Sequence, residues 1–454
     1  MFSAIGRASN AVSLAKLPNQ LVRASSTGAA IRRLPAVFSD ILDMLNVELQ
    51  PSKTLEKYVR PTRFGLNVAG EFISDAQKHV VMALGKPAAP YAEAYLDKAA
   101  GRVEAMLCTT KLDMPHRPGL IEGLIARDVT VVDGNHPVAA AHSVNLVRTV
   151  EEFISTQVPS DTAHFVFIVG GGFTAMGSDN LDAAAKRDAA MRAGEPITVL
   201  NEFSSQQRLA YGGLLGLIRD RLNPVSAARA SFNTMLVDDV GKNDPTIVGS
   251  SPTIDGSDQC HVTTILESSM VAERIEKHLL EQGHKLVSIP RGFMSDKEVG
   301  LLVSRLFSLV RQVQREEKGD VYMVLDGEPV VNRDIQKGTV GGRGSLLVAE
   351  FAKLIAGGDG IELLVVNTDG DDGNRGEGAA WCDGNTWSIC DALGSAIVTG
   401  DTGRVLKAHG FTGQGVEAGL TNVNDVAVLR VRCDVPYADD ASIVYVAGLG
   451  SAVV

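Results

Sequence analysis

The sequence predicts an α/β protein with two α/β domains, a Rossmann-like, mostly parallel sheet followed by a smaller domain with a mixed sheet. Three observations predict this class. The chain has 454 residues, more than one ordinary domain holds. Its apolar fraction of 45% and charged fraction of 21% are those of a soluble globular protein. Its 46 glycines and an aromatic fraction of only 5% favour tight turns between strands and helices.

Residues 1–35 are expected to be a mitochondrial transit peptide. The stretch has no acidic residue before Asp40, is rich in Ser and Ala, and carries five basic residues: Arg7, Lys16, Arg23, Arg32 and Arg33. It lacks the unbroken apolar core of a secretory signal. We therefore expect import into the mitochondrial matrix, with processing after Ala24; removal of all five positive charges of residues 1–35 would lower the net charge from −11 to −16. An ordinary disordered tail is the alternative.

The first domain, residues 36–290, is predicted from short apolar runs that end in turn residues. Such runs are typical of buried parallel strands. They begin at His79 (HVVMALGK), Val103 (VEAMLCT), Asp128 (DVTVVDG), His164 (HFVFIVGGG), Phe232 (FNTMLVDDV) and His284 (HKLVSIP). Helices are expected between strands, for example over 201–222 and 267–283.

The second domain, residues 291–454, is predicted to begin near a helix with a marked start. Ser295 and Glu298 form the pattern of a capping box, and an apolar stripe at helical spacing follows. Strands then resume with fewer helices between them, which predicts the mixed sheet. They begin at Asp320 (DVYMVLDGEP), Ile361 (IELLVVNTDG), Ala396 (AIVTGDTG), Asp425 (DVAVLRVRCDV) and Ser442 (SIVYVAGLG).

Charge and cysteine content exclude several classes of function. A net charge of −11 leaves no broad basic face, so nucleic-acid binding is not expected. The five cysteines are odd in number and form no CxxC pair, which favours reduced thiols over a zinc or disulfide framework. No apolar run reaches the roughly 18 residues that a membrane span needs. An anionic substrate would therefore require a local positive site.

A glycine-rich turn follows the strand at His164. Gly170, Gly171 and Gly172 leave backbone amides free to approach an anion. With Ala175 the run also fits a GxGxxA dinucleotide fingerprint, so a nicotinamide-dependent oxidoreductase stays an alternative, with Glu202 as the residue that would bind the ribose. A tight turn with no ligand is the simpler interpretation.

Acidic and basic side chains end other strands of the first domain. Asp238 and Asp239 could bind a metal, or one of them could act as general base on a hydroxyl. Ser250 and Thr253 fall where a helix could begin and bind phosphate. Lys86 ends the strand at His79, where it is either a phosphate ligand or a solvated lysine.

The second domain has two further clusters. Glu328 follows one strand, and the later Gly341-Gly342-Arg343-Gly344 presents an arginine suited to clamping a phosphoryl group, with Lys337 nearby. Asp369, Asp371 and Asp372 stand among glycines at the end of another strand, where they could hold Mg²⁺ or a substrate hydroxyl.

Taken in order, these motifs resemble the glycerate 2-kinase family, whose C-terminal part is called the MOFRL domain. The segment LGKPAA is similar to the family's GKAA, GNHPVAAAHS to its HPVPD, and VGGGFTA to its SGGGSAL. The stretch MLVDDVGKNDPTIVGSSPT resembles SDV-GDD-IASGPT. In the second half, DGEPVV with GGRG, NTDGDDG and LTNVNDVAVL resemble GGEPTV with GGRNQE, TDGIDG and GTNVNDL.

The resemblance implies transfer of a phosphoryl group from ATP to D-glycerate or a related small hydroxy acid, with Mg²⁺, in a cleft between two domains. It implies three catalytic residues: Lys86, Asp239 and Arg343. It implies nucleotide or phosphate binding by Gly170, Gly171, Gly172, Ser250, Thr253, Glu328, Gly341, Gly342 and Asn422, and metal binding by Asp369 and Asp372. The expected partners are the substrate and either a second copy of the chain or a mitochondrial protein complex.

Several motif positions depart from the family. Val169 and Phe173 replace serines beside the triple glycine, Asp238 replaces the serine of Ser-Asp, and Lys242-Asn243 replaces the following Gly-Asp. The phosphate-binding backbone is thus partly kept and its polar side chains are fewer. The alternative function is a catalytically degenerate relative that serves as a structural or accessory subunit of a mitochondrial complex.

Overall fold

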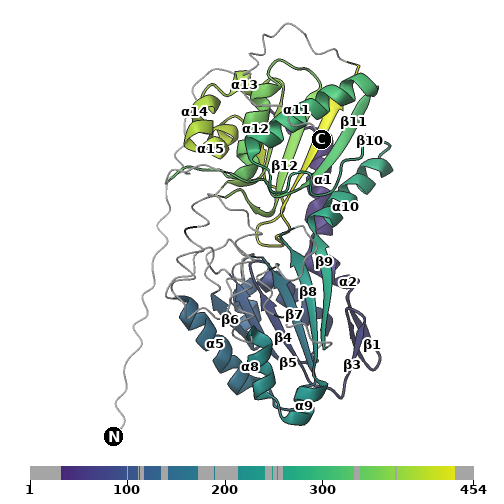
Figure 1. The fold of residues 1–454 in the computed structure, drawn as a ribbon, viewed down its shortest axis with the longest axis vertical. Helices are drawn as coiled ribbons and strands as arrows, with labels where there is room; N and C mark the ends of the chain where they lie inside the picture. Colours follow the sequence, from purple (N-terminus) through teal and green to yellow (C-terminus); the bar gives the residue numbers. More distant parts are fainter. Residues whose placement is uncertain are drawn as a thin grey trace.

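The structure, a computed structural model, describes residues 32–99, 101–110, 112, 117–133, 142–171, 189, 213–240, 248, 253, 259–331, 338–373 and 376–434. Two six-stranded sheets with their helices are stacked along the long axis of the molecule (Figure 1). We call the half that contains the first sheet the lower lobe and the half that contains the second sheet the upper lobe. The predicted α/β class, one parallel and one mixed sheet, is confirmed.

The lower lobe contains a six-stranded parallel sheet in the order β6-β5-β4-β7-β8-β9. Its strands are β4 (His79–Leu84), β5 (Val103–Thr110), β6 (Val129–Asp133), β7 (His164–Gly170), β8 (Ser231–Asp238) and β9 (Cys260–Glu267). Every residue of β4 and β7 is buried, which explains their continuous apolar sequences. The order of strands reverses between β4 and β7. Open α/β sheets bind ligands beyond the carboxyl ends of the strands at such a point.

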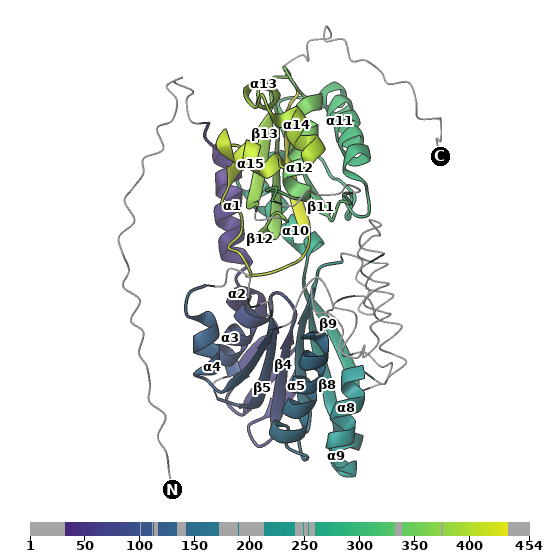
Figure 2. The ribbon, with the colours of Figure 1, turned by 90° about the vertical axis from the view of Figure 1, so that its left-hand side faces the viewer.

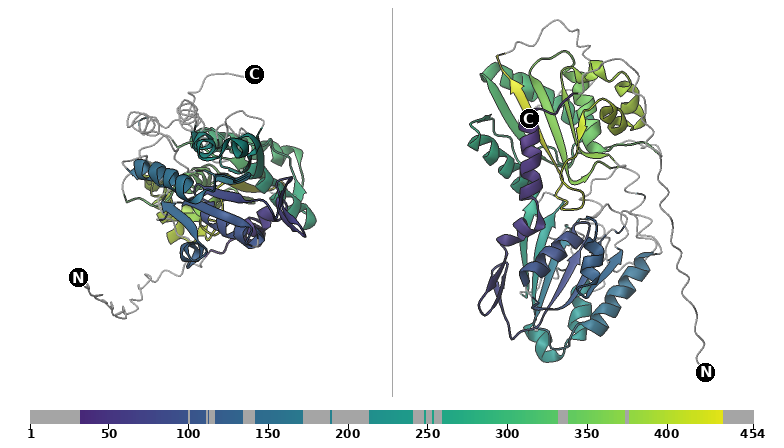
Figure 3. Two further views of the ribbon diagram at one scale, coloured as in Figure 1. Left: turned by 90° about the horizontal axis from the view of Figure 1, so that it is seen from below. Right: turned by 180° about the vertical axis from the view of Figure 1, so that it is seen from behind.

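Helices cover both faces of this sheet (Figure 2, Figure 3). They are α3 (Ala88–Ala99), α4 (Leu120–Ile125), α5 (His142–Gln157), α8 (Gly213–Arg221) and α9 (Pro224–Arg229). Successive residues of β4 point to opposite faces: Val81 packs in one core cluster with Tyr95 of α3, and Met82 packs in another with Phe153 of α5 and Ile218 of α8. The apolar contacts on both faces hold the carboxyl ends of β4, β7 and β8 in place.

The upper lobe contains a mixed sheet in the order β10-β11-β15-β12-β13-β14. Its strands are β10 (Lys285–Leu286), β11 (Asp320–Gly327), β12 (Ile361–Asp371), β13 (Glu377–Asp383), β14 (Thr412–Gly413) and β15 (Asp425–Arg432). Strand β15 runs antiparallel to both of its neighbours, and its first residue, Asp425, is paired with Gly327 of β11 and Asn367 of β12. The ends of β11 and β12 and the start of β15 therefore meet at one edge.

Helices from both halves of the sequence pack on the upper sheet. They are α1 (Ala36–Glu48), α10 (Ser268–Glu281), α11 (Val299–Glu316), α12 (Arg343–Leu354), α13 (Thr386–Ile389), α14 (Leu393–Thr399) and α15 (Thr402–Ala408). Helix α1 lies beside α10 in the upper lobe (Figures 2 and 3), whereas α2 (Pro51–Glu56) contacts α3 in the lower lobe. In the described part of the chain, no helix is both long and apolar enough to cross a membrane. The domain boundary at 290/291 stays a prediction.

A small antiparallel sheet precedes the lower sheet and was not predicted. It consists of β1 (Val59–Thr62), β2 (Gly65–Val68) and β3 (Glu71–Ser74). Glu71 ties it to the amino ends of β7 and β8, because its carboxylate lies 3.0 Å from His164 Nδ1 and accepts hydrogen bonds from Ser231 Oγ, at 2.6 Å, and Asn233 Nδ2.

The predicted capping box at Ser295 is wrong. Helix α11 begins three residues later, and Glu298 is its N-cap, with a side chain that accepts a hydrogen bond from Leu301 N at 3.2 Å. The cause is pairing with the end of β11: Asp296 N donates to Glu328 O at 3.1 Å, and Asp296 has a left-handed φ of 56°. Residues 295 and 296 are therefore part of a turn held against the segment that follows β11, and Glu298 pairs with Val330 in an isolated parallel bridge.

Other local predictions also need correction. The strand predicted at Ala396 is instead the end of α14 and the start of α15, separated by Gly400 with φ 82°. The strand predicted at His284 is the two-residue β10, which belongs to the upper sheet. Strands β9 and β13 were not predicted. The predicted strand at Ser442 and residues 1–31 of the predicted leader lie outside the described residues.

Candidate active site

The glycine turns after β4 and β7 fit closely together at the point where the strand order reverses. Gly85 has a φ of 109°, and a Cβ there would lie 2.4 Å from Gly170 O. Lys86 N donates to Gly171 O at 2.8 Å. A Cβ on Gly171 would lie 1.6 Å from Asp239 Oδ2. Glycine is therefore required at 85, where backbone atoms leave no room, and a side chain at 171 would displace the Asp239 carboxylate; the turn places Lys86 at the upper rim of the sheet.

Asp239, directly after β8, is a buried carboxylic acid with a raised pKa. Burial and the neighbouring Asp238 and Glu328 raise its pKa to about 8, while Lys86 acts to lower it. Its Oδ2 lies 3.5 Å from Asn422 Nδ2, and its Oδ1 has no hydrogen-bond partner among the described residues. A carboxyl group with a pKa near neutral and a free oxygen is suited to accept a proton from a substrate hydroxyl.

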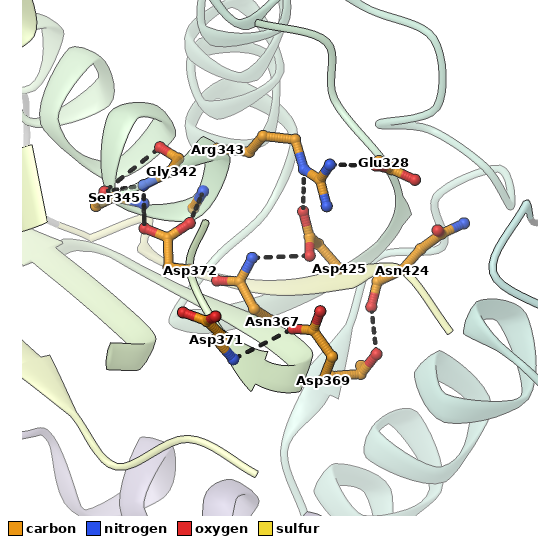
Figure 4. A network of polar contacts seen from close by, with 12 residues as sticks. Glu328, Gly342, Arg343, Ser345, Asn367, Asp369, Asp371, Asp372, Asn424 and Asp425 are labelled. Atoms are coloured by element: carbon orange, nitrogen blue, oxygen red, sulfur yellow. Dashed lines mark hydrogen bonds and ion pairs between the residues drawn. The ribbon is translucent and has the colours of Figure 1, made fainter. Parts of the chain in front are cut away.

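Arg343, the first residue of α12, extends over the edge of the upper sheet (Figure 4). Its guanidinium forms an ion pair with Glu328, and its Nε lies 3.4 Å from Asp425 Oδ2. The side chain is 39% exposed, so the guanidinium is accessible to a ligand. Asp425 is buried, which raises its pKa to about 7 despite the opposing effect of Arg343. Asn367 Nδ2 donates to Asp425 Oδ1 at 2.9 Å.

Two polar contacts join the lobes at this site. Lys86 Nζ of the lower lobe lies 3.3 Å from Asp369 Oδ2 of the upper lobe. Asn422, in the loop before β15, approaches Asp239 as described above. Asp369 also contributes to the electrostatic environment of Arg343. The predicted catalytic residues Lys86, Asp239 and Arg343, together with the predicted Glu328, Asp369 and Asn422, thus gather where the two sheets face each other.

Asp372 caps helix α12 in the structure. Its two carboxylate oxygens accept hydrogen bonds from the backbone amides of Gly342, Gly344 and Ser345 at 2.8–2.9 Å (Figure 4). Negative charge at a helix N-terminus is stabilising, and these bonds occupy the carboxylate. The arrangement favours a structural role for Asp372 over the predicted metal role, which stays a prediction.

The predicted phosphate-binding glycines Gly341 and Gly342 pack within the upper lobe. A Cβ on Gly341 would lie 2.6 Å from Gly403 N of α15. The amide of Gly342 is used by Asp372 and, at 3.1 Å, by Ser345 Oγ. These glycines allow α12 to start close to α15, and the Arg343 side chain is the part of the motif that reaches the site.

The remaining predicted residues are not brought to the site by the described contacts. Thr253 is buried, and its hydroxyl accepts a hydrogen bond from Thr234 of β8 at 2.8 Å. Gly172, Ser250, Phe173 and Glu202 lie outside the described residues. Their predicted roles stay predictions.

Sequence reasoning missed Asn367, Asn424 and Asp425. Asn424 has a left-handed φ of 69°, and its carbonyl accepts a hydrogen bond from Thr368 Oγ1 at 2.6 Å. The same hydroxyl accepts from Val423 N at 2.9 Å, so Thr368 fixes the turn before β15. The Asn424-Asp425 pair directly before the apolar run was the available signal, because Asn and Asp are the residues that tolerate left-handed turn positions.

The donor set fits Mg²⁺ that arrives with a nucleotide better than a preformed metal centre. Among the described residues, no group of three or more His, Cys, Asp or Glu is arranged to hold a metal ion. Mg²⁺ is commonly bound by one or two carboxylates together with substrate phosphates and water. Asp369 could supply such a carboxylate.

A family model described as a domain of unknown function, DUF4147, matches residues 38–282, more than half of the chain. The chain belongs to the DUF4147 family. The match runs from α1 to the end of α10, so it includes the whole lower sheet of this DUF4147 protein.

Two curated relatives are similar over most of this DUF4147 protein. The D-glycerate 2-kinase of Thermotoga maritima is 22% identical over 77% of the chain and 89% of its own length. The glycerate 2-kinase of Sulfurisphaera tokodaii is 23% identical over 78% of the chain and 90% of its own length. The predicted resemblance to glycerate 2-kinases is confirmed as a distant homology.

Two solved structures share the fold. A crystal structure of glycerate kinase from Thermotoga maritima superimposes with a TM-score of 0.65 at 17% identity, covering 87% of this chain and 98% of that structure. The PH0495 protein from Pyrococcus horikoshii superimposes with a TM-score of 0.63 at 16% identity, with the same coverage. These matches confirm the architecture of two lobes.

Proposed function

We propose that this DUF4147 protein transfers a phosphoryl group from ATP to a hydroxyl of D-glycerate or a related small hydroxy acid. One observation carries the proposal: a buried acid with a raised pKa, Asp239, lies close enough to Lys86 of the lower lobe and to Glu328, the ion-pair partner of Arg343 in the upper lobe, for both to affect its pKa. The names of the homologous kinases support the same reaction class.

Asp239 would act as the general base. The proton of the substrate hydroxyl passes to Asp239 Oδ1, and the resulting oxygen attacks the γ-phosphorus. The bond from that phosphorus to the bridging oxygen breaks, and ADP leaves with the electron pair. A pKa of about 8 allows Asp239 to take and return a proton near neutral pH.

Lys86 and Arg343 would neutralise the negative charge of the phosphates and of the substrate carboxylate. Phosphoryl transfer depends mainly on positioning and electrostatic stabilisation, which two cations, one from each lobe, would supply. Each is paired with a carboxylate, Lys86 with Asp369 and Arg343 with Glu328. The carboxylates hold both cations in place until phosphate oxygens compete for them. Bound Mg²⁺ would supply further charge neutralisation on the phosphates.

The test is ADP release by the purified protein with ATP, Mg²⁺ and D-glycerate. Lys86→Ala should lower the rate about 10²–10³-fold. Lys78→Ala is the matched control, because Lys78 precedes the same strand at its opposite end and pairs with Glu104 and Asp161. Equal rates for the two variants, or no hydroxy acid that stimulates ADP release, would reject the kinase proposal. Capture of a stable mitochondrial partner together with no turnover would favour the accessory-subunit alternative.

We further propose that the chain acts in the mitochondrial matrix, on the evidence of the acid-free, arginine-containing residues 1–35. A fluorescent protein fused behind these residues should enter mitochondria. A diffuse cytosolic signal would contradict the proposal.

A further inference from the structure

The loop from Gly415 to Asn422, which we call the 415–422 loop, carries the residue that approaches Asp239. It crosses the lower end of the upper lobe, between α1 and the lower lobe (Figure 2). Two contacts hold its inner side against the site: Gly419 N donates to Asp369 O at 3.0 Å, and Gly370, with φ 77°, leaves room for Ala418, whose Cα would lie 2.5 Å from a Cβ at 370. The position of Asn422 therefore depends on this loop.

The outer side of the loop is held by Asn46, a residue of α1. Asn46 Nδ2 donates to Gly415 O at 3.1 Å, and Asn46 Oδ1 accepts from Glu417 N at 2.9 Å. The same Nδ2 also donates to Leu42 O at 3.0 Å, which fixes the amide on its helix. A side-chain amide that pairs with both a donor and an acceptor of the backbone defines where those two residues lie.

A second group of side chains packs against the same loop from the lower lobe. The hydroxyls of Tyr91 in α3 and Thr54 in α2 are buried next to Thr421, which directly precedes Asn422. Burial raises the pKa of Tyr91 to about 12, and Thr54 and Thr421 act against that rise. None of these three hydroxyls has a hydrogen-bond partner among the described residues, so the lower lobe bounds the loop by packing immediately before the residue that reaches Asp239.

We propose that Asn46 is a positioning residue of the active site: through Gly415 and Glu417 it holds the 415–422 loop so that Asn422 meets Asp239 and Gly419 supports Asp369. The proposal deepens the proposed function and rests on it for its effect on catalysis. It gives a role in the site to a helix that lies at the other end of the sequence. Asn46 touches none of the reacting atoms, so it acts only through the loop.

The experiment uses the full chain with Asn46→Ala. The matched control is Asn67→Ala, because Asn67 Oδ1 also accepts a backbone amide, Gly70 N at 3.2 Å, but does so in the remote β2–β3 turn. Asn46→Ala should lower kcat for ADP release about tenfold or more, since displacement of a site by about 1 Å can cost 10²-fold. The KM for ATP should change less than kcat. Combining Asn46→Ala with Asn422→Ala should cost less than the sum of the two single effects, because both variants act on the contact between Asn422 and Asp239.

Hydrogen exchange separates this inference from the kinase proposal. In Asn46→Ala the amides of Gly419 and Val423 should exchange faster than in the unmodified protein, whereas in Asn67→Ala they should not. Unchanged exchange at these two amides overturns the inference. In an active enzyme, equal kcat values for Asn46→Ala and Asn67→Ala also overturn it. The same holds if the effects of Asn46→Ala and Asn422→Ala on kcat are additive. If the unmodified protein releases no ADP, the proposed function fails and exchange at Gly419 and Val423 alone decides the inference.

Discussion

Asp239 shows how one residue can favour catalysis and oppose stability. The closeness of Gly171 and the burial around it leave the carboxylate little access to water. Its folded pKa of about 8 is above the unperturbed value of 3.8. The folded state therefore binds a proton that the unfolded state releases, and Asp239 lowers the stability progressively as pH rises from about 4 to 8. The 415–422 loop brings Asn422 to the same carboxylate.

The pH dependence of ADP release should follow this residue. We expect kcat to rise through a pKa near 8, since only ionised Asp239 accepts a proton. Asp239→Asn should lower kcat about 10²–10³-fold and remove that rise. At pH 9 the same variant should unfold at a higher temperature, by at least about 1 kcal/mol of added stability, because a buried charge is gone.

Asp161→Asn is the control for that prediction, because Asp161 is an exposed carboxylate paired with Lys78 at the opposite end of the sheet. It should leave both the pH profile and the melting temperature unchanged. An Asp239→Asn protein that melts at a lower temperature at pH 9 would contradict the argument.

At the scale of elements, helix α12 holds Arg343, the arginine of the glycine-rich motif, in a fixed position. Arg343 is the first residue of this helix, and Asp372 from the β12–β13 connection holds three amides of its first turn. The direction of the Arg343 side chain is therefore set by a residue that was predicted as a metal ligand.

Replacing Asp372 should loosen the start of helix α12 and so disturb the position of Arg343 in the site. Asp372→Ala should destabilise the fold by about 1–3 kcal/mol, because buried amides lose their acceptor. It should also lower ADP release per folded molecule about tenfold or more, since Arg343 is no longer held in place. Denaturant unfolding and activity measured on the same sample check both expectations.

Asn223→Ala provides the comparison at the element scale. Asn223 caps helix α9, far from the site, through Val225 N at 3.1 Å and Ser226 N at 2.9 Å. Its loss should cost about 1 kcal/mol and leave activity per folded molecule unchanged. If Asp372→Ala behaves in the same way, α12 does not position Arg343.

The sequence allowed the buried central elements to be predicted, because their signal is local. Strands β4 and β7 are buried along their whole length, and their apolar runs identified them. Strand β9 was missed because its first half is partly exposed and carries a histidine and two threonines. The capping box was wrong because pairing between Asp296 and Glu328, distant in sequence, outweighed a local pattern.

The candidate site could be predicted only where its residues lie in recognisable motifs. Lys86 and Asp239 come just after strands and Arg343 begins a helix, each within a glycine-rich or acidic cluster. Asp425 was assigned to a strand without a further role, because its position depends on the register that pairs it with Gly327 and Asn367. Asn46 reaches the 415–422 loop across more than 360 positions of sequence, which no local pattern reveals.

At the scale of the whole molecule, Glu71 joins the small sheet to the lower lobe. Burial acts to raise its pKa, but hydrogen bonds with His164, Ser231 and Asn233 outweigh burial and lower the pKa from 4.5 to about 2. A lowered acid pKa adds stability that is present above about pH 4.5 and is lost as pH falls toward 2.

In Glu71→Gln the free energy of unfolding should therefore depend less on pH below about 4.5. The lowering of the Glu71 pKa from 4.5 to about 2 corresponds to at most roughly 3 kcal/mol of the free energy of unfolding. We expect the unmodified protein to lose stability between pH 4.5 and 2 more steeply than the variant, as measured by urea unfolding at each pH. Parallel curves would show that Glu71 does not carry this effect. Glu104→Gln, at an exposed ion pair with Lys78, is the control.

The central position of β15 has a consequence for the order in which the molecule can be made. On the ribosome, β11 and β12 emerge long before residue 425, yet both must wait for β15 to fill the space between them. Helix α1, among the first described residues to be synthesised, likewise waits for partners such as Gly415 and Glu417. A chain cut short before Asp425 would have a complete lower sheet and upper strands with open edges, a form that favours aggregation and degradation by proteases.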